Sequence, residues 1–389
     1  MKKVGVITGT RAEYGLLKPL ITKLDKAADM ELQLIVTGMH LSPEFGLTYR
    51  EIEQDGFQIK ERNEMLLSSD TPNGITKSIG LSILGFADIY TRIRPDIVII
   101  LGDRYEIFAA ATAAMIHRIP IAHIHGGELT EGLIDDSIRH SITKMSSLHF
   151  TSTEWYRRRV IQLGEQPESV FNVGALGVEN IKKQNLLSKK DLEQSIDFLL
   201  DKPYLMVTFH PVTLENNTSE VQFGNLLSAL DAFTEFHIIF TKANADTDGR
   251  IVNSLIDEYV KKNKGRTVAF ASLGTLRYLS ALKYCEMVIG NSSSGILEAP
   301  SLHIPTVNIG DRQAGRIKGR SVIDCGWTVA EIVHGIQWAQ ALKKDGYLQN
   351  DVNVYEGKNT SETIMQILRQ YMMSDNNTKK EFYDIEWEK

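Results

Sequence analysis

The sequence predicts an α/β protein built from two Rossmann-like, doubly wound domains that face a cleft. Short apolar runs alternate with amphipathic segments along the chain, which is the pattern of βαβ units in a parallel sheet. The alternation restarts after a polar, lysine-rich segment near the middle, and a length of 389 residues fits two domains of roughly 150 residues each. We place the N-terminal domain at 1–174 and the C-terminal domain at 175–361, with a helix at about 362–389 that packs back on the first domain.

Five apolar runs in the first domain have strand character, and four helical patterns lie between them. The expected strands are Val4–Thr8, Leu32–Thr37, Ile97–Leu101, Ile119–Ile124 and Leu148–Thr151. The expected helices are Tyr14–Ala27, Thr76–Ile93, Tyr105–His117 and Ile138–Ser146. Because helices separate the strands, a parallel sheet is predicted.

The second domain repeats this pattern after a bridge at 173–202. Its expected strands are Tyr204–Phe209, His237–Thr241, Val268–Ala271, Met287–Ile289 and Thr306–Ile309, and its expected helices are Val221–Phe233, Arg250–Lys261, Leu276–Ala281 and Ser294–Ala299. The last helical pattern, Glu362–Met373, carries apolar residues at helical spacing. The last dozen residues are polar and are expected to fray.

Composition excludes several classes of protein. A net charge of −6 argues against nucleic-acid binding, which normally needs a basic face. Cys285 and Cys325 give no disulfide framework and indicate reduced thiols in the cytosol. Arg11 and Glu13 interrupt the N-terminal apolar run, which predicts a strand and not a signal peptide, and no apolar stretch approaches membrane-spanning length. We therefore expect a cytoplasmic protein without a membrane or nucleic-acid partner.

The segment from His123 to His140 is the strongest indication of an active site. It contains three histidines, four carboxylates, an arginine and a Gly-Gly pair, and it lies where a buried strand is followed by a helix. Ligands of open α/β sheets bind at the carboxyl ends of strands. A charged surface loop is the alternative, but such loops rarely combine Gly-Gly with so many titratable groups.

Neither common nucleotide signature occurs. The chain has no G-x-G-x-x-G in its first turn and no G-x-x-x-x-G-K-[ST] anywhere, which disfavours a dinucleotide oxidoreductase and a P-loop NTPase. Gly9 still permits a tight turn, and Arg11 lies just before the first helix, where it is suited to a phosphate or is simply a surface arginine.

The sequence Gly-Asn-Ser-Ser-Ser-Gly at 290–295 predicts an anion-binding loop. It follows a strand and opens a helix, so backbone N–H groups and the hydroxyls of Ser292 and Ser293 are available to a phosphate. Glu298, one turn further on, suits a ribose diol. Serine N-capping is the alternative, but three serines between two glycines exceed what a cap needs.

Other polar residues follow strands elsewhere. Asp103 and Arg104 end a very apolar strand, although Asp103 also suits a helix cap. His210 is either a site residue or a packed loop histidine, and Asn244 either contacts a ligand or shapes a turn. Arg312 follows another strand and is a candidate anion contact.

A metal site is an alternative at His123 and His125, which would share a face of an extended strand near Glu128, Asp135 and Asp136. No fixed ligand spacing such as H-E-x-x-H supports a metal, so none is predicted.

The chain resembles the UDP-N-acetylglucosamine 2-epimerases, specifically the hydrolysing branch that begins sialic acid biosynthesis. The resemblance covers nearly the whole chain. Its most specific parts are Thr-Gly-Thr-Arg-Ala-Glu at 8–13, Val-Thr-Gly-Met-His at 36–40, Leu-Gly-Asp-Arg at 101–104, Gly-Gly-Glu at 126–128, Asp-Asp-Ser-Ile-Arg-His at 135–140, Gly-Asn-Ser-Ser-Ser-Gly at 290–295 and Asn-Ile-Gly-Asp-Arg at 308–312.

The resemblance implies a fold of the glycosyltransferase-B kind with a sugar nucleotide in the cleft. It implies conversion of UDP-N-acetylglucosamine and water to N-acetylmannosamine and UDP, by elimination to 2-acetamidoglucal and addition of water. The family's chemistry needs no metal and no cofactor. The expected partners are the UDP-sugar and UDP, and the expected assembly is a homodimer or homotetramer.

The resemblance also assigns residues. Asp103 and Asp135 match carboxylates with acid–base roles, and His210 matches a histidine beside the diphosphate. Residues that match nucleotide contacts are Arg11, Arg104, Asn244, Ser292, Ser293, Glu298 and Arg312. One departure concerns proton transfer, because several relatives have a catalytic glutamate where this chain has His125. His125, Glu128 or both are therefore predicted to move the C2 proton, since an imidazole or a desolvated carboxylate titrates near neutrality.

Three further interpretations stay open at this stage. The segment at 41–49 resembles that of a close branch of the family, and this resemblance implies the same chemistry on a nucleotide-linked 2,4-diacetamido-2,4,6-trideoxy sugar for legionaminic acid. A glycosyltransferase on the same fold is more distant, because it would need an acceptor groove with basic or apolar membrane-facing helices, and none is evident. A non-catalytic sensor would not need the acid cluster.

Overall fold

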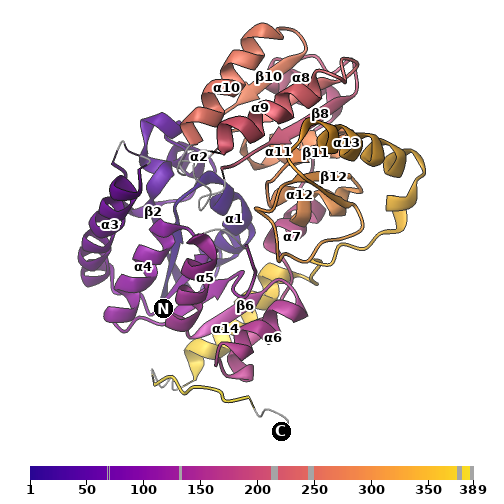
Figure 1. Ribbon diagram of the computed structural model, residues 1–389. Helices are drawn as coiled ribbons and strands as arrows, with labels where there is room; N and C mark the ends of the chain where they lie inside the picture. Colours follow the sequence, from indigo (N-terminus) through magenta and orange to yellow (C-terminus); the bar gives the residue numbers. More distant parts are fainter. Residues whose placement is uncertain are drawn as a thin grey trace. The chain divides into compact units, whose positions relative to one another are not determined.

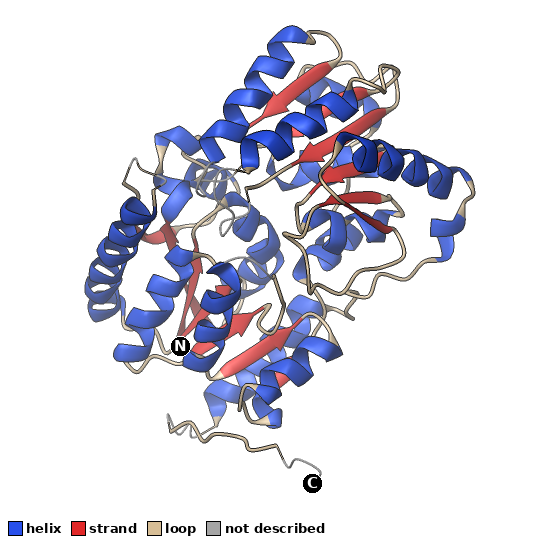
Figure 2. Cartoon of the chain, in the orientation of Figure 1, coloured by secondary structure: helices blue, strands red, loops and turns tan. Residues whose placement is uncertain are grey.

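The computed structural model describes residues 1–67, 69, 71–130, 134–211, 218–243, 249–374 and 379–385. The chain forms two compact units, each built around its own parallel sheet (Figures 1 and 2). The first unit comprises 1–128, 135–180 and 355–389, and the second comprises 129–134 and 181–354. The main divisions fall after Asn180 and Val354, whereas the sequence analysis placed them after 174 and 361.

The first unit contains a seven-stranded parallel sheet in the order β3-β2-β1-β4-β5-β6-β7. Its strands are β1 (Lys2–Thr8), β2 (Met30–Thr37), β3 (Ile59–Asn63), β4 (Ile97–Leu101), β5 (Ile121–Ile124), β6 (Leu148–Thr151) and β7 (Val170–Asn172). The strand order changes direction between β1 and β4, which creates a topological switch point. In doubly wound folds, ligands bind outside the carboxyl ends of the strands at such a point.

Helices cover both faces of this sheet. They are α1 (Arg11–Asp25), α2 (Tyr49–Gln54), α3 (Pro72–Ile93), α4 (Tyr105–Ile116), α5 (Ile134–Met145), α6 (Glu154–Gln162), α7 (Leu176–Lys183) and α14 (Thr360–Met373). One core joins α1 and α14 to the sheet, and a separate core joins α3 and α4 to the opposite face. Because both faces are covered, β1 and β4 are nearly continuous apolar runs.

The C-terminal helix α14 packs on α1. It ends at Met373, whereas the sequence analysis placed this helix at about 362–389. Ile364, Met365 and Leu368 are buried in the same core as α1. Ion pairs border the contact, with Lys23 Nζ 2.5 Å from Glu362 Oε2 and Arg369 Nε 2.9 Å from Asp29 Oδ2.

The segment 379–385 beyond this helix is held against the first unit, although the sequence predicted frayed residues there. The Tyr383 N–H donates to the Gly164 carbonyl at 3.0 Å, and Lys380 Nζ lies 2.6 Å from Glu165 Oε2. Specific polar contacts therefore order a segment whose composition alone indicated disorder.

The second unit contains a six-stranded parallel sheet in the order β10-β9-β8-β11-β12-β13. Its strands are β8 (Tyr204–Thr208), β9 (His237–Thr241), β10 (Thr267–Phe270), β11 (Met287–Gly290), β12 (Thr306–Ile309) and β13 (Val322–Cys325). Its helices are α8 (Lys189–Ile196), α9 (Ser219–Leu230), α10 (Gly249–Lys262), α11 (Gly274–Tyr284), α12 (Ser294–Leu297) and α13 (Val329–Lys344). The switch point here lies between β8 and β11.

Each unit is thus a doubly wound α/β sheet, and the predicted fold class is confirmed. The second unit has cores on both faces, one with α9, α10 and α13 and the other with α8 and α11. Within the described ranges, no helix is long and apolar enough to cross a membrane.

Candidate active site

The predicted site residues of the first unit lie at the carboxyl ends of adjacent strands. Arg11 begins α1 directly after β1, and Asp103 and Arg104 follow β4. His125 and Glu128 follow β5. Since β1, β4 and β5 are consecutive neighbours in the parallel sheet, their loops emerge at the same edge.

The backbone at His125 has a conformation that L-residues rarely adopt. His125 has φ +67°, and Gly127 has φ +79°. A Cβ atom at Gly127 would lie 2.5 Å from the Tyr156 carbonyl oxygen, so only glycine fits. Gly127 therefore serves close backbone packing. Such backbone strain at a non-glycine residue is characteristic of functional sites.

Glu128 and His125 face each other across this turn. His125 Nδ1 lies 3.6 Å from Glu128 Oε1, and the Ser152 hydroxyl donates to the same oxygen at 2.8 Å. The His125 side chain is only 7% exposed and the Glu128 side chain only 2% exposed. The site therefore pairs an imidazole with a desolvated carboxylate, a combination suited to proton transfer.

Arg139 connects the acids of the cluster. Its Nη1 donates to the Glu128 carbonyl at 2.8 Å and to Asp136 Oδ1 at 3.1 Å, and its Nη2 donates to Asp103 Oδ2. The Arg139 side chain is 1% exposed. A buried guanidinium thus fixes the loop after β4 and the loop after β5 to α5. Asp135 lies in the first turn of α5, half-buried beside Asp136.

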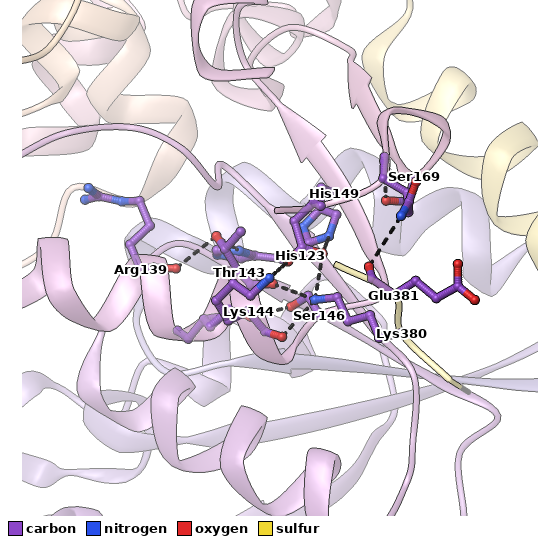
Figure 3. Close-up of polar contacts among 12 residues, drawn as sticks. His123, Arg139, Thr143, Lys144, Ser146, His149, Ser169, Lys380 and Glu381 are labelled. Carbon is purple, nitrogen blue, oxygen red and sulfur yellow. Dashed lines mark hydrogen bonds and ion pairs between the residues drawn. The ribbon is translucent and has the colours of Figure 1, made fainter. Parts of the chain in front are cut away.

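His123 is buried and its ring contacts protein groups, so it is not positioned as a metal ligand. Its Nε2 lies 2.8 Å from the Gly102 carbonyl, and its Nδ1 lies 3.3 Å from the Thr143 hydroxyl (Figure 3). Burial lowers the pKa of His123 to about 3, so the ring is neutral at physiological pH. In the part of the chain that is described, no group of three or more His, Cys, Asp or Glu residues is arranged to hold a metal ion.

A second polar cluster anchors the far end of α5 (Figure 3). The carboxylate oxygens of Glu165 lie 2.9 Å from His149 Nε2, 2.6 Å from Lys144 Nζ and 2.6 Å from Lys380 Nζ. Lys380 also donates to the Lys144 carbonyl at 2.8 Å, which satisfies a backbone acceptor in the last turn of the helix.

The second unit holds the predicted anion loop at the carboxyl end of β11. Gly290 has φ +135°, and a Cβ there would lie 1.9 Å from the Thr208 carbonyl oxygen, so β8 and β11 approach closely at this point. Ser292 and Ser293 are half-buried. The helix after them, α12, spans only Ser294–Leu297 and continues as a 3₁₀ turn at Ala299–Leu302. The sequence predicted Ser294–Ala299, and so short a helix contributes little dipole.

Asn291 is the residue that organises this loop. Its Oδ1 accepts from the His210 N–H at 2.7 Å, and its Nδ2 donates to the His210 carbonyl at 2.7 Å. Its own carbonyl accepts from Arg312 Nη1 at 3.1 Å and from Gln313 Nε2 at 2.8 Å. Three predicted elements (His210 after β8, the serines after β11 and Arg312 after β12) are therefore joined through one asparagine.

Two predicted residues of the second half of the chain remain, Glu298 and Asn244. Burial raises the pKa of the Glu298 carboxyl, partly offset by a hydrogen bond from Ser294. Asn244 lies outside the described residues. Sequence reasoning did not single out Arg139, Asn291, Glu13 or Glu106. Asn291 and Arg139 stand inside motifs that it quoted, so their position was the only available signal.

Comparison with known proteins assigns the family. The model of the UDP-N-acetylglucosamine 2-epimerase family matches residues 22–369. The crystal structure of the Methanocaldococcus jannaschii UDP-GlcNAc 2-epimerase in complex with UDP-GlcNAc and UDP has a TM-score of 0.78 at 21% identity, covering 95% of this chain and 99% of that one. The fold is therefore of the glycosyltransferase-B type, and the chain belongs to the UDP-N-acetylglucosamine 2-epimerase family.

Two relatives are considerably more similar in sequence. GDP/UDP-N,N'-diacetylbacillosamine 2-epimerase (hydrolyzing) of Campylobacter jejuni is 46% identical over 323 residues, which are 83% of this chain and 84% of that protein. Polysialic acid biosynthesis protein P7 of Escherichia coli is 44% identical over 386 residues, which are 99% of this chain and 98% of that protein.

Proposed function

We propose that this enzyme is a hydrolysing UDP-N-acetylglucosamine 2-epimerase, which converts UDP-GlcNAc and water to N-acetylmannosamine and UDP. The observation that carries the proposal is the cluster of buried His125, Glu128 and Arg139 with half-buried Asp103 at the carboxyl ends of β4 and β5. Support also comes from the 44% identity to the polysialic acid biosynthesis protein over nearly the full length of both chains.

The first chemical step in this proposal is elimination of UDP. The C1–O bond breaks with its electron pair moving to the departing diphosphate, a base removes the C2 proton, and a C1=C2 double bond forms. Negative charge develops on the diphosphate, so stabilisation by N–H, hydroxyl and guanidinium donors lowers the barrier. Ser292, Ser293 and Arg312 are proposed for this role in the second unit, with His210 beside the diphosphate.

Arg11 and Arg104 are the proposed cationic contacts of the first unit, and Glu298 is proposed to accept from the ribose diol. Asn244 is proposed as a further nucleotide contact on the family resemblance alone. Each of these roles is assigned by the position of the residue after a strand and by its donor or acceptor chemistry.

The second step adds water to the 2-acetamidoglucal. The water oxygen bonds to C1, and a proton is delivered to C2 on the face opposite to the one it left, which gives N-acetylmannosamine.

For the first step, we propose His125 as the group that takes the C2 proton, because a neighbouring carboxylate at 3.6 Å stabilises the imidazolium that results. Asp103 and Asp135 are proposed to stabilise positive charge at C1 and to activate the water.

A second candidate substrate is a nucleotide-linked 2,4-diacetamido-2,4,6-trideoxy sugar. The observation in its favour is the 46% identity to the hydrolysing diacetylbacillosamine 2-epimerase. The chemistry at C1 and C2 is the same for both sugars, so the catalytic residues proposed above apply to either one. Only the groups that contact C4 and C6 need to differ.

The deciding experiment is incubation of the purified protein with UDP-GlcNAc, without added metal, and with UDP-N,N'-diacetylbacillosamine in parallel. Proton NMR and anion-exchange separation identify the products. Free N-acetylmannosamine together with UDP is the expected result. UDP-N-acetylmannosamine as the sole product would indicate a non-hydrolysing enzyme, and turnover of only the diacetamido sugar would assign the second candidate.

A further inference from the structure

Two buried glutamates, Glu13 and Glu106, lie beside the switch point of the first sheet and take no part in the mechanism above. Glu13 is in the first turn of α1, after β1, and Glu106 is in the first turn of α4, after β4. The two helices cover opposite faces of the sheet (Figure 1), so their first turns meet at its carboxyl edge. The residues are 5% and 1% exposed.

Gly9 brings the two carboxylates to one place. The Gly9 N–H donates to Glu13 Oε2 at 2.7 Å, and a Cβ on Gly9 would lie 2.4 Å from Glu106 Cγ and 2.8 Å from its Oε1. Gly38, with φ +58°, approaches the same Glu106 oxygen, since its Cβ would lie 3.3 Å away. Both acids therefore border the backbone turn after β1, and the absence of a side chain on Gly9 is what admits Glu106.

Such a pair cannot easily carry two negative charges. Burial of each ionised carboxylate costs free energy, and like charges at close range add to that cost. Arg104 Nε donates to Glu106 Oε1 at 2.7 Å and balances one charge. Among the described residues, Glu13 Oε1 and Glu106 Oε2 are buried atoms that accept no hydrogen bond. One proton held by the pair removes the second charge and supplies a donor.

The electrostatic environment agrees with a proton on Glu13. Burial and the Glu106 charge raise the pKa of Glu13 to about 8, against the lowering effects of Arg104 and of the Gly9 and Thr10 N–H groups. The neighbouring His40 stays neutral, because burial and the nearby Arg11 lower its pKa to about 3. Glu13 is thus the group that changes charge as the pH rises above neutrality.

We propose that the pair holds one proton, on Glu13, and that both glutamates act as positioning residues that keep Arg104 in place and keep the turn after β1 free of the net negative charge that would repel an anionic substrate. While the proton is held, Arg104 balances the single charge of the pair. When the proton leaves, the three groups together become negative beside Arg11 and repel a diphosphate. The inference rests on the proposed function only in that the anionic substrate is a nucleotide sugar.

The test is the pH dependence of KM and kcat for UDP-GlcNAc in the parent and in Glu13→Gln. A glutamine copies the protonated acid, since its carbonyl can accept from the Gly9 N–H and it carries no charge at any pH. In the parent, KM should rise about tenfold between about pH 7 and about pH 9, with a smaller change in kcat. In Glu13→Gln this ratio of KM values should fall to about twofold or less.

Glu106→Gln tests the other half of the pair. It removes the anchor of Arg104, so KM at neutral pH should rise about tenfold and the alkaline step should vanish. The matched control is Glu179→Gln, which alters another buried glutamate of the same unit, one that accepts from the Ser361 N–H at 2.7 Å. It should lower thermal stability and keep the alkaline rise of KM.

Infrared difference spectroscopy of the ligand-free protein makes the test independent of turnover. A protonated carboxylic acid C=O band should disappear between about pH 7 and about pH 9 in the parent and be missing in Glu13→Gln. An unchanged band in Glu13→Gln, or an unchanged alkaline rise of KM, would overturn the inference. Lack of turnover of UDP-GlcNAc by the parent would instead count against the proposed function, and the infrared result would still decide the proton.

Discussion

The Arg139 guanidinium of α5 is bonded to the Asp103 carboxylate of the loop after β4, and it simultaneously donates to the Glu128 carbonyl. Two loops that are 25 residues apart along the chain, from Asp103 to Glu128, are held together by one side chain that is 1% exposed. Because a fully buried arginine needs this set of acceptors, its bonds fix the position of the acid and not only its charge.

Replacement of Arg139 should therefore disable the active site. Arg139→Ala is expected to destabilise the first unit by about 3 kcal/mol, because the partners of a buried ion pair are left behind. Arg139→Lys keeps the charge and loses the forked geometry, so it should remain folded and lose about 100-fold in kcat. Thermal denaturation and steady-state kinetics measure the two effects, and full activity of Arg139→Lys would show that charge alone suffices.

Asn291 should be important for nucleotide binding although it is not proposed to touch the nucleotide. Asn291→Ala removes two hydrogen bonds to the backbone of His210, each worth about 1 kcal/mol, and frees the loop that carries the serines. The dissociation constant for UDP, measured by calorimetry, should rise about tenfold or more.

Asn308→Ala provides the control for Asn291. Asn308 is equally buried in the neighbouring strand β12, but its amide donates to Asp324 Oδ1 on β13. This variant should lose stability and retain UDP affinity within about twofold. Equal losses of affinity in both variants would mean that the effect of Asn291 is general destabilisation of the second unit.

The sequence predicted the parts of the fold that are governed by burial. Strands β4, β6, β9 and β12 were predicted with the bounds that the structure gives, because these parallel strands are buried along their whole length and are rich in the β-branched and aromatic residues that favour strands. The edge strands β3, β7 and β13 were missed. Ile59–Asn63, for example, has the sequence Ile-Lys-Glu-Arg-Asn, which lacks an apolar run because an edge strand is partly solvated.

The sequence identified the loops that carry the site residues, but it did not predict the contacts between their side chains. Motif residues such as Asp103 and His125 were found because strand ends collect functional groups. Whether Arg139 bonds Asp103 depends on how α5 packs beside the loop after β4. Whether Glu13 approaches Glu106 depends on two helices that cover opposite faces of the sheet. Spacing along the chain does not encode such meetings. The Gly9 position illustrates this, since a turn was predicted and a close carboxylate was found.

The ion cluster at the end of α5 predicts acid sensitivity. Although burial opposes it, hydrogen bonds from His149, Lys144 and Lys380 lower the pKa of Glu165 to about 2. The folded-state pKa is below the unfolded value, so this stabilisation is fully present above about pH 4.5 and is lost as the pH falls toward about 2.

Lys380→Ala should make acid unfolding begin at a higher pH, because one of the cations that lower the pKa of Glu165 is removed. A loss of about 1 kcal/mol near neutral pH is expected, since the lysine is about one-third exposed and partly screened. Urea denaturation at several pH values measures it. Lys60→Ala, which alters an exposed lysine on β3, is the control, and equal acid sensitivity of the two variants would contradict the assignment.

The C2 proton provides the most direct test of the residues proposed for catalysis. If His125 removes it, His125→Ala should lower kcat by about 100-fold or more and leave UDP affinity nearly unchanged, because imidazole acts only on the reacting carbon. Incorporation of deuterium at C2 in D₂O, followed by NMR, should slow in parallel.

Glu128→Gln is the control for His125→Ala. It keeps the hydrogen-bonding shape beside His125 but removes the charge that stabilises the imidazolium, so a smaller loss of kcat of about tenfold is expected. The reverse order, in which Glu128→Gln abolishes exchange and His125→Ala retains it, would assign the base to the carboxylate. An unchanged kcat in His125→Ala would exclude this histidine from proton transfer, and the strained backbone at φ +67° would then serve only to present Glu128.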